Sequence, residues 1–249
     1  MTIRHARRPR FITSCITAGA VCLALSSAVT PVAAETPPPA GAVSTTRLVT
    51  SPAPVDRASE RARRPIYLTF DDGPVPAHTR ELLKILKANG VSATFFVLGN
   101  LVRKNPEVVR EEKAAGHAIG NHTWGHRELT RVSRREIVRQ LVDGGKAIKS
   151  ALGKNTGCMR PPYGSTNGTV RSVNRQLHLK QILWSVDTND WRLPSVNTLT
   201  RRILNARPGD VVLMHDGGGP RSRTNAAVAR ALPKMVKRGD RFATVPSCL

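Results

Sequence analysis

The chain has 249 residues, of which 40% are hydrophobic and 22% charged, and this suits one medium-sized domain with extensions better than two full domains. Nineteen glycines and 18 prolines exclude a fibrous repeat, and the apolar content excludes wholesale disorder. Lysine and arginine outnumber acidic residues by 39 to 17, and the net charge of +22 predicts polyanionic surroundings, while an aromatic content of 4% is poor material for stacking nucleic-acid bases.

The first 34 residues have the pattern of a secretory signal peptide. Four arginines within the first ten residues precede a mostly apolar stretch over residues 11–29, and Val32-Ala33-Ala34 leads to a predicted cleavage before Glu35. An uncleaved anchor is the alternative, because this stretch approaches the roughly 20 residues of a membrane span; its serine, threonine and glycine content favours cleavage. Cleavage removes four arginines and no acidic residue, which leaves 35 basic and 17 acidic side chains, or +18, on the mature chain.

Residues 35–64 are rich in proline, alanine, serine, threonine and arginine without apolar periodicity, which is typical of an extended linker. A single folded domain is then expected over residues 65–249. Two of the four cysteines lie in the signal segment, so Cys158 and Cys248 remain. An even pair in an oxidising compartment predicts a disulfide that fastens the carboxyl end to the body of the domain.

Short apolar runs alternate with helical patterns from Pro65 onward. Strands are predicted at residues 66–70, 93–98, 118–119, 158–160, 181–186, 210–214 and 241–245. Helices are predicted around residues 82–86, 105–116, 133–153, 169–177, 195–204 and 224–237. About seven strand–helix units indicate a parallel sheet covered by helices, either open or closed into a barrel.

Three helix boundaries and breaks are marked by particular residues. Asn105-Pro106 fits a capped helix start, with proline in the first turn. Ser133 and Glu136 fit a capping box, in which each side chain satisfies a free backbone donor. Pro233 interrupts the last helical pattern and is expected to kink it.

Polar side chains gather directly after the predicted strands. They are Asp71-Asp72-Gly73, His122 and His126, Arg160 to Gly164, Asp187 to Trp191, and His215-Asp216. The carboxyl ends of parallel strands share one edge of a sheet or barrel, so we expect these side chains to converge on one rim. Two histidines four residues apart and a neighbouring carboxylate supply three metal ligands and leave positions open for water and substrate.

Each of these pieces also has a purely structural alternative. Asp-Asp-Gly is common in turns, the His-x-x-x-His spacing occurs by chance, and the segment from Arg160 to Tyr163 could be a rigid loop only. Trp184 and Trp191 suit core or rim packing better than a sugar platform, with Trp191 the better platform candidate. The convergence of all the pieces on one rim is what favours a functional site.

Five motifs in this order resemble those of the polysaccharide deacetylase family, also called the NodB-homology domain. They are the segments TFDDGP at 69–74, HTWGH at 122–126, RPPY at 160–163, DTNDW at 187–191 and VLMH at 212–215. The resemblance covers about residues 66–245, and its motifs are specific for the family but much less so for the substrate. Val212 departs slightly from the pattern, because another aliphatic residue is commoner there.

The resemblance implies a fold and a metal site. The fold is a distorted (β/α)7 barrel in a single domain. Asp72, His122 and His126 would hold a divalent metal, usually Zn²⁺, with Co²⁺ or Ni²⁺ as alternatives.

The resemblance also implies catalytic roles. Asp71 would be the general base, paired with Arg160, and His215 would be the general acid, tuned by Asp190. The backbone N–H of Tyr163 would help to hold the oxyanion. The residues expected against the substrate are Trp191, Leu213 and Tyr163.

The expected function is a secreted, metal-dependent hydrolase that removes N-acetyl groups from a polysaccharide containing N-acetylglucosamine, either peptidoglycan or chitin and its oligomers. An O-acetyl esterase on xylan is the close alternative. A non-catalytic glycan-binding protein is disfavoured because no ligand, base or acid position is missing, and nucleic-acid binding is opposed by the signal peptide and the scarce aromatics. We expect a monomer, retained at an anionic cell wall and without stable membrane insertion after signal cleavage.

Overall fold

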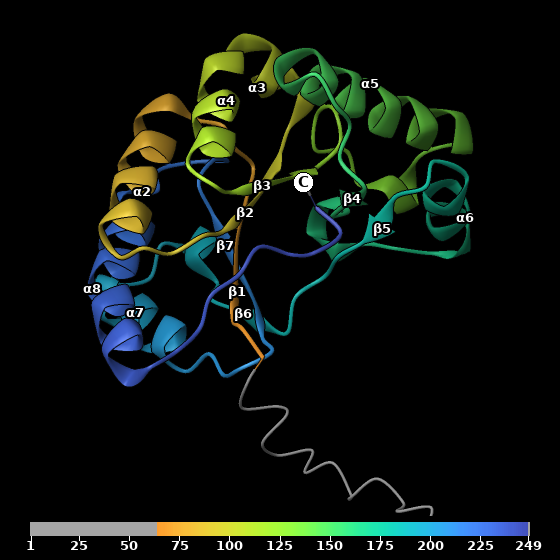
Figure 1. Ribbon diagram of the computed structural model, residues 1–249. Coiled ribbons are helices and arrows are strands. Elements are labelled where there is room, and N and C mark those ends of the chain that lie inside the picture. Colours follow the sequence, from red (N-terminus) through yellow and green to blue (C-terminus); the bar gives the residue numbers. More distant parts are fainter. Residues whose placement is uncertain (1–63, 249) are drawn as a thin grey trace, which may run out of the picture. The chain divides into compact units, whose positions relative to one another are not determined.

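The computed structural model describes residues 64–248, so the predicted signal peptide at 1–34 and nearly all of the predicted linker at 35–64 lie outside the described residues (Figure 1). Within residues 64–248, seven strands form one sheet: β1 (Tyr67–Asp71), β2 (Thr94–Val97), β3 (Ala118–Asn121), β4 (Cys158–Met159), β5 (Lys180–Gln181), β6 (Val186–Asp187) and β7 (Val211–His215). Every neighbouring pair is parallel, in the order β5-β4-β3-β2-β1-β7-β6.

The connection between the edge strands shows that this sheet is curled. β5 and β6 lie at opposite edges, yet only residues 182–185 separate them. The five Cα steps from Gln181 to Val186 reach about 18 Å at most, whereas the edges of a flat seven-stranded sheet lie about 29 Å apart. The strands therefore form an incompletely closed barrel, and the predicted distorted (β/α)7 barrel is confirmed.

The helices lie along the outside of the strands (Figure 1). They are α2 (Pro76–Ala88), α3 (Gly99–Lys104), α4 (Pro106–Ala114), α5 (Arg134–Leu152), α6 (Gly168–Gln176), α7 (Val196–Leu204) and α8 (Ser222–Arg238), with single 3₁₀ turns at Leu129–Arg131, Pro162–Gly164 and Asp190–Arg192. Each longer helix buries one apolar face; α8, for example, buries Ala227, Ala231 and Met235. None of the described helices is both long and apolar enough to cross a membrane.

Two predicted strands are corrected by the structure. The predicted strand at 181–186 is two short edge strands, because the chain leaves one edge of the sheet after Gln181 and joins the other at Val186. The predicted strand at 241–245 forms only an isolated bridge, between Ile66 and Phe242.

The carboxyl-terminal segment runs as a strap across the amino-terminal ends of the strands. After the bridge at Phe242, the backbone N–H of Val245 donates to Thr94 Oγ1, at the start of β2, over 2.9 Å. Cys248 then forms a disulfide with Cys158, the first residue of β4, with 5.0 Å between the Cα atoms. The strap packs on Phe96 and Ala118 and closes the end of the barrel that lies away from the polar motifs.

The predicted helix boundaries are correct in part. Ser133 Oγ accepts a hydrogen bond from the backbone N–H of Glu136, but the Glu136 carboxylate binds Arg139 and Gln140, so half of the capping box forms. Asn105 precedes α4 as expected, yet its side chain donates to Leu101 O in α3. Pro233 lies inside α8, which continues as a single helix to Arg238.

Candidate active site

A cleft of about 500 Å³ opens at the carboxyl ends of the strands. Its walls come from the ends of the strands β1, β6 and β7 and from the loops that follow the strands. The lining residues are Asp71, Asp72, His122, His126, Tyr163, Trp184, Asp187, Trp191, Leu213, His215, Gly218 and Arg221. The rim that the sequence predicted from parallel strands is therefore one continuous cleft.

Three of the lining residues form a cluster suited to a metal ion. Asp72 follows β1 with φ of 71°, and its Oδ1 lies 3.3 Å from His122 Nε2 and 3.2 Å from His126 Nε2. One ligand atom from each of the three residues lies within 4.8 Å of the other two. This is the Asp-His-His set that the motifs predicted.

The hydrogen bonding of His122 shows that the cluster fits a cation. His122 Nδ1 lies 2.8 Å from the carbonyl oxygen of Arg160, which can only accept, so Nδ1 carries a proton, and in the neutral ring Nε2 presents its lone pair to Asp72. Asp72 Oδ1 is itself buried and receives no well-aligned hydrogen bond. Two buried electron-pair donors facing each other at this distance repel unless a proton or a metal cation lies between them.

The charges of the cluster also suit metal binding. Burial raises the pKa of Asp72, but the His122 and His126 rings outweigh it and hold this pKa well below its usual range. Burial lowers the pKa of His126, which favours the neutral ring that a metal requires. Burial also lowers the pKa of His122, yet Asp71 and Asp72 together raise it above its ordinary value. The negative charge of Asp71 and Asp72 thus favours a proton on His122, and a divalent cation would neutralise the same charge.

Asp71, the last residue of β1, is held by the guanidinium of Arg160. Arg160 Nη1 donates to Asp71 Oδ1 and to Thr69 Oγ1, both over 2.8 Å. The side chain of Arg160 is 0% exposed and lies over the Phe96 ring at 4.2 Å.

The same guanidinium spans the gap between the edge strands. Its Nε donates to Ile182 O and its Nη2 donates to Leu183 O, in the segment that joins β5 to β6. Arg160 thus fixes Asp71 and satisfies backbone carbonyls that no neighbouring strand reaches. The Asp71 Oδ2 atom remains on the cleft side, 3.7 Å from His122 Nε2.

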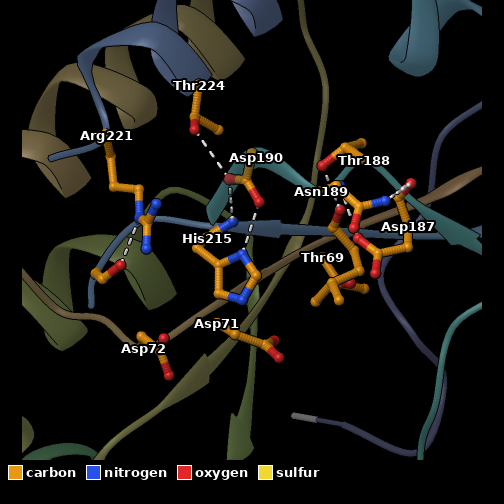
Figure 2. A network of polar contacts seen from close by, with 12 residues as sticks. Thr69, Asp71, Asp72, Asp187, Thr188, Asn189, Asp190, His215, Arg221 and Thr224 are labelled. Atoms are coloured by element: carbon orange, nitrogen blue, oxygen red, sulfur yellow. Dashed lines mark hydrogen bonds and ion pairs between the residues drawn. The ribbon is translucent and has the colours of Figure 1, made fainter. Parts of the chain in front are cut away.

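On the opposite flank, His215 ends β7 and is oriented by Asp190 (Figure 2). His215 Nδ1 lies 2.7 Å from Asp190 Oδ1, and its backbone N–H donates to Oδ2 over 2.9 Å. Thr224 Oγ1, at the start of α8, donates to the same Oδ2 over 2.9 Å. Burial lowers the pKa of His215, but the bond and charge of Asp190 raise it above the ordinary value. The ring is thereby biased toward its protonated form, with Nε2 on the cleft side.

The remaining predicted residues form the outer wall of the cleft. Tyr163 has φ of 60°, a left-handed conformation that costs a non-glycine residue free energy, and its ring packs edge-on against His126. Tyr163 as a whole is 67% exposed and Trp191 is 49% exposed, whereas Leu213 is buried at the base of the wall. Trp184, expected in the core or rim, lines the cleft as well.

The structure thus places all the predicted site residues together, with Arg160 and Asp190 behind the lining. Sequence reasoning missed Thr69 and Thr224, which fix Arg160 and Asp190. Thr69 lies inside a quoted motif, so its place could have been noticed. Thr224 and Arg221 belong to no motif, and their contacts depend on how α8 packs.

Comparisons with known proteins agree with this geometry. The family model described as polysaccharide deacetylase matches residues 58–182. A peptidoglycan-N-acetylglucosamine deacetylase from Bacillus cereus is 38% identical over 187 residues, which cover 74% of this chain and 87% of that protein. A chitooligosaccharide deacetylase from Sinorhizobium fredii is 35% identical over 193 residues, covering 73% and 90%.

The structure is also similar to that of a family 4 carbohydrate esterase from Streptomyces lividans solved in complex with acetate. The TM-score is 0.70 at 32% identity, and the match covers 75% of this chain and 97% of that one. Fold, motif order and sequence identity agree, and the chain belongs to the polysaccharide deacetylase family.

Proposed function

We propose that this protein is a metal-dependent hydrolase that removes N-acetyl groups from a polysaccharide containing N-acetylglucosamine, with peptidoglycan and chitin or its oligomers as the leading substrates. One observation carries the proposal: a proton acceptor, Asp71, and a proton donor, His215, lie in one cleft with the Asp72–His122–His126 cluster. The names of the relatives from Bacillus cereus and Sinorhizobium fredii support the substrate class.

The first half of the reaction requires a nucleophile at neutral pH. A divalent cation held by Asp72, His122 and His126 would act as a Lewis acid and lower the pKa of water from about 15.7 toward about 7. Zn²⁺ suits this ligand set best, with Co²⁺ or Ni²⁺ as alternatives. Asp71 accepts the proton from the attacking water, and the hydrogen bond from Arg160 fixes the position of its carboxylate. The backbone N–H of Tyr163 stabilises the developing negative oxygen.

The second half requires a proton for the leaving amine, because an amide anion is a very poor leaving group. His215 donates this proton from Nε2, since its Nδ1 is engaged by Asp190. Leu213 and Trp191 offer apolar contact to the methyl group of the acetyl moiety. The roles of base and acid thus follow from the charge of each residue's partner: the Arg160 guanidinium orients the Asp71 carboxylate, and the Asp190 carboxylate favours the protonated form of His215.

We also propose that the protein works outside the cell, at the wall. The Cys158–Cys248 disulfide supports this location, because disulfides persist in oxidising compartments. The excess of basic residues suits retention at an anionic polymer.

The experiment is a comparison of acetate release from peptidoglycan, chitohexaose and acetylated xylan under equal conditions. Metal-stripped protein is tested alone and after addition of Zn²⁺, Co²⁺ or Ni²⁺. We expect release from the first two substrates, dependent on added metal and reduced about 10²- to 10⁴-fold by Asp71→Asn, which removes the base. Asp143→Asn, a matched loss of a carboxylate on the outer helix α5, should leave the rate unchanged.

Other outcomes assign other functions. Release from xylan alone would identify an O-acetyl esterase. Binding of the polymers without acetate release by any metal-loaded form would identify a glycan-binding protein, and full activity of the stripped protein would exclude the metal.

A further inference from the structure

The proposed mechanism leaves one basic residue of the cleft unused. Arg221 precedes α8 and is 3% exposed, and among residues 64–248 it is the only lysine or arginine that lines the cleft. In Figure 2 it lies above Asp72, on the side of the cleft away from Asp187. A guanidinium in this position requires an explanation, because a buried cation without a counter-charge costs free energy.

The guanidinium of Arg221 has no anionic partner within residues 64–248. Its Nε donates to Gly217 O over 2.6 Å, and no carboxylate oxygen of the described chain lies within 4.0 Å of it. The two terminal nitrogens make no hydrogen bond to residues 64–248 and keep some solvent-accessible surface, and the residue lines the cleft. A planar fork of two free N–H groups matches the two oxygens of a carboxylate.

The loop that carries Arg221 is built against the metal-binding residue Asp72. A Cβ at Gly217 would lie 1.9 Å from the Asp72 carbonyl oxygen, and one at Gly218 would lie 2.5 Å from Asp72 Oδ2. Gly217 in turn holds Arg221 through its carbonyl. These close approaches, open only to glycine, fix the guanidinium beside the proposed reaction centre.

The start of α8 adds to the positive potential at this point. The helix has 17 residues, its first turn contains no acidic residue, and its N-cap makes no side-chain hydrogen bond. Free N–H groups at a helix start attract negative charge. The three acidic lining residues do not supply it. Asp71 is paired with Arg160, Asp72 belongs to the proposed metal cluster and lies more than 4.0 Å from the guanidinium, and Asp187 accepts from Asn189 on the other flank.

We propose that Arg221 forms a carboxylate-binding subsite of the cleft. The inference rests on the proposed function for the source of the ligand, which is either the acetate that the reaction releases or a carboxylate on a sugar next to the acetylated one. The second source would make Arg221 a specificity residue that favours glycans with a free sugar carboxylate, such as strands with peptide-free muramic acid, over neutral chitin oligomers.

The test measures binding calorimetrically in the zinc-loaded Asp71→Asn protein, which lacks the proposed base and does not turn the ligands over. The probes are two matched pairs: acetate with acetamide, and N-acetylglucosaminyl-N-acetylmuramic acid with N,N′-diacetylchitobiose, which lacks the lactyl carboxylate. We expect Arg221→Met to weaken one carboxylate probe about 10- to 100-fold and its neutral partner less than about twofold. Arg221→Lys, which keeps the charge but loses the fork, should fall between.

The pair that responds identifies the source of the carboxylate. Arg223→Met serves as the matched control, because Arg223 is an exposed arginine two residues away whose Nη1 donates to Leu193 O outside the cleft. Equal weakening of charged and neutral probes by Arg221→Met, or no weakening of either carboxylate, overturns the proposal.

If Arg221→Met does not fold, the parent protein decides: it should bind the muramic acid disaccharide or acetate more tightly than the neutral partner, and equal affinities overturn the proposal. Absence of acetate release from every polymer would count against the proposed function and leave these binding results standing.

Discussion

At the level of single residues, the protonation of His215 is controlled by a short chain of hydrogen bonds that begins at helix α8. Thr224 holds Asp190, and Asp190 holds both Nδ1 and the backbone N–H of His215. Because burial alone would lower the pKa of His215, its raised pKa depends on the charge of Asp190. A general acid with a raised pKa keeps its proton further into the alkaline range, which extends the pH range of the reaction upward.

This dependence predicts how activity responds to pH. Asp190→Asn removes the negative charge, so the pKa of His215 falls and the alkaline limb of the kcat–pH profile moves to lower pH. We expect kcat at about pH 8 to fall about 10- to 100-fold on an N-acetylated oligosaccharide, since most of the acid is deprotonated there. The loss should be smaller on an acetate ester, whose alcohol leaves more readily without protonation.

Thr224→Val provides the control for this prediction. The valine removes the hydroxyl that binds Asp190 Oδ2 but keeps both charges of the pair. The alkaline limb should therefore stay close to its original pH while kcat falls only a few-fold through looser positioning. If the alkaline limb of the kcat–pH profile stays at the same pH in Asp190→Asn, Asp190 does not control the proton on His215.

The site residues that sequence could predict are those that directly follow strands. Asp71 and His215 are the last residues of β1 and β7, and Asp72 follows Asp71 directly. Parallel pairing of β1 with β7 brings them together whatever the details of the loops. Arg221 could not be found in this way, because its place depends on a glycine loop and on the packing of α8. The free fork of its guanidinium becomes visible only when the partners of every nitrogen are known.

At the level of elements, the contact between β2 and β3 contains a buried histidine that makes folding sensitive to acid. His117, just before β3, is 2% exposed, and its Nδ1 accepts from the backbone N–H of Ala93, just before β2, over 3.1 Å. Burial lowers the pKa of His117 to about 4. In the unfolded chain the ring titrates near 6.5, so between these two values the unfolded state binds more protons and stability falls as pH falls.

We expect this one ring to remove about 2 kcal/mol of unfolding free energy between about pH 7.5 and about pH 5. The matched variant is His117→Asn, whose Oδ1 can accept from Ala93 and does not titrate in this range. Urea unfolding of both proteins at the two pH values isolates the effect, because carboxylates contribute equally to each. A difference between the two proteins that stays constant with pH would contradict the assignment.

The elements that sequence predicted least well are those at the edges of the barrel. β1, β2 and β7 are continuous apolar runs, because they are buried between neighbours on both sides. β5 and β6 have two residues each and are only partly buried, so neither has an apolar run of its own. The sequence therefore does not show that residues 181–186 belong to two strands. The segment 241–245 has strand-like composition, yet it crosses the strand ends as a strap and finds a single bridge.

At the level of the whole molecule, the cleft with the proposed catalytic residues and the carboxyl-terminal strap lie at opposite ends of the barrel. The cleft lies at the carboxyl ends of the strands, whereas the strap from Phe242 to Cys248 covers their amino ends and packs in a small cluster with Phe96 and Ala118. This separation means that changes in the strap alter the stability of the fold without touching the residues of the cleft.

The Cys158–Cys248 disulfide allows this separation to be tested. The bond closes a loop between residues 90 positions apart, and its removal restores conformational freedom to the unfolded chain, which destabilises the protein by about 2–4 kcal/mol. We expect Cys248→Ala to lower Tm by roughly 5–15 °C while kcat well below Tm stays unchanged, because the strap lies away from the cleft. A reductant should lower the Tm of the parent protein toward that of the variant and leave the variant unaffected. A loss of kcat in the fully folded variant would instead show that the strap holds the strand ends, and through them the catalytic groups, in place.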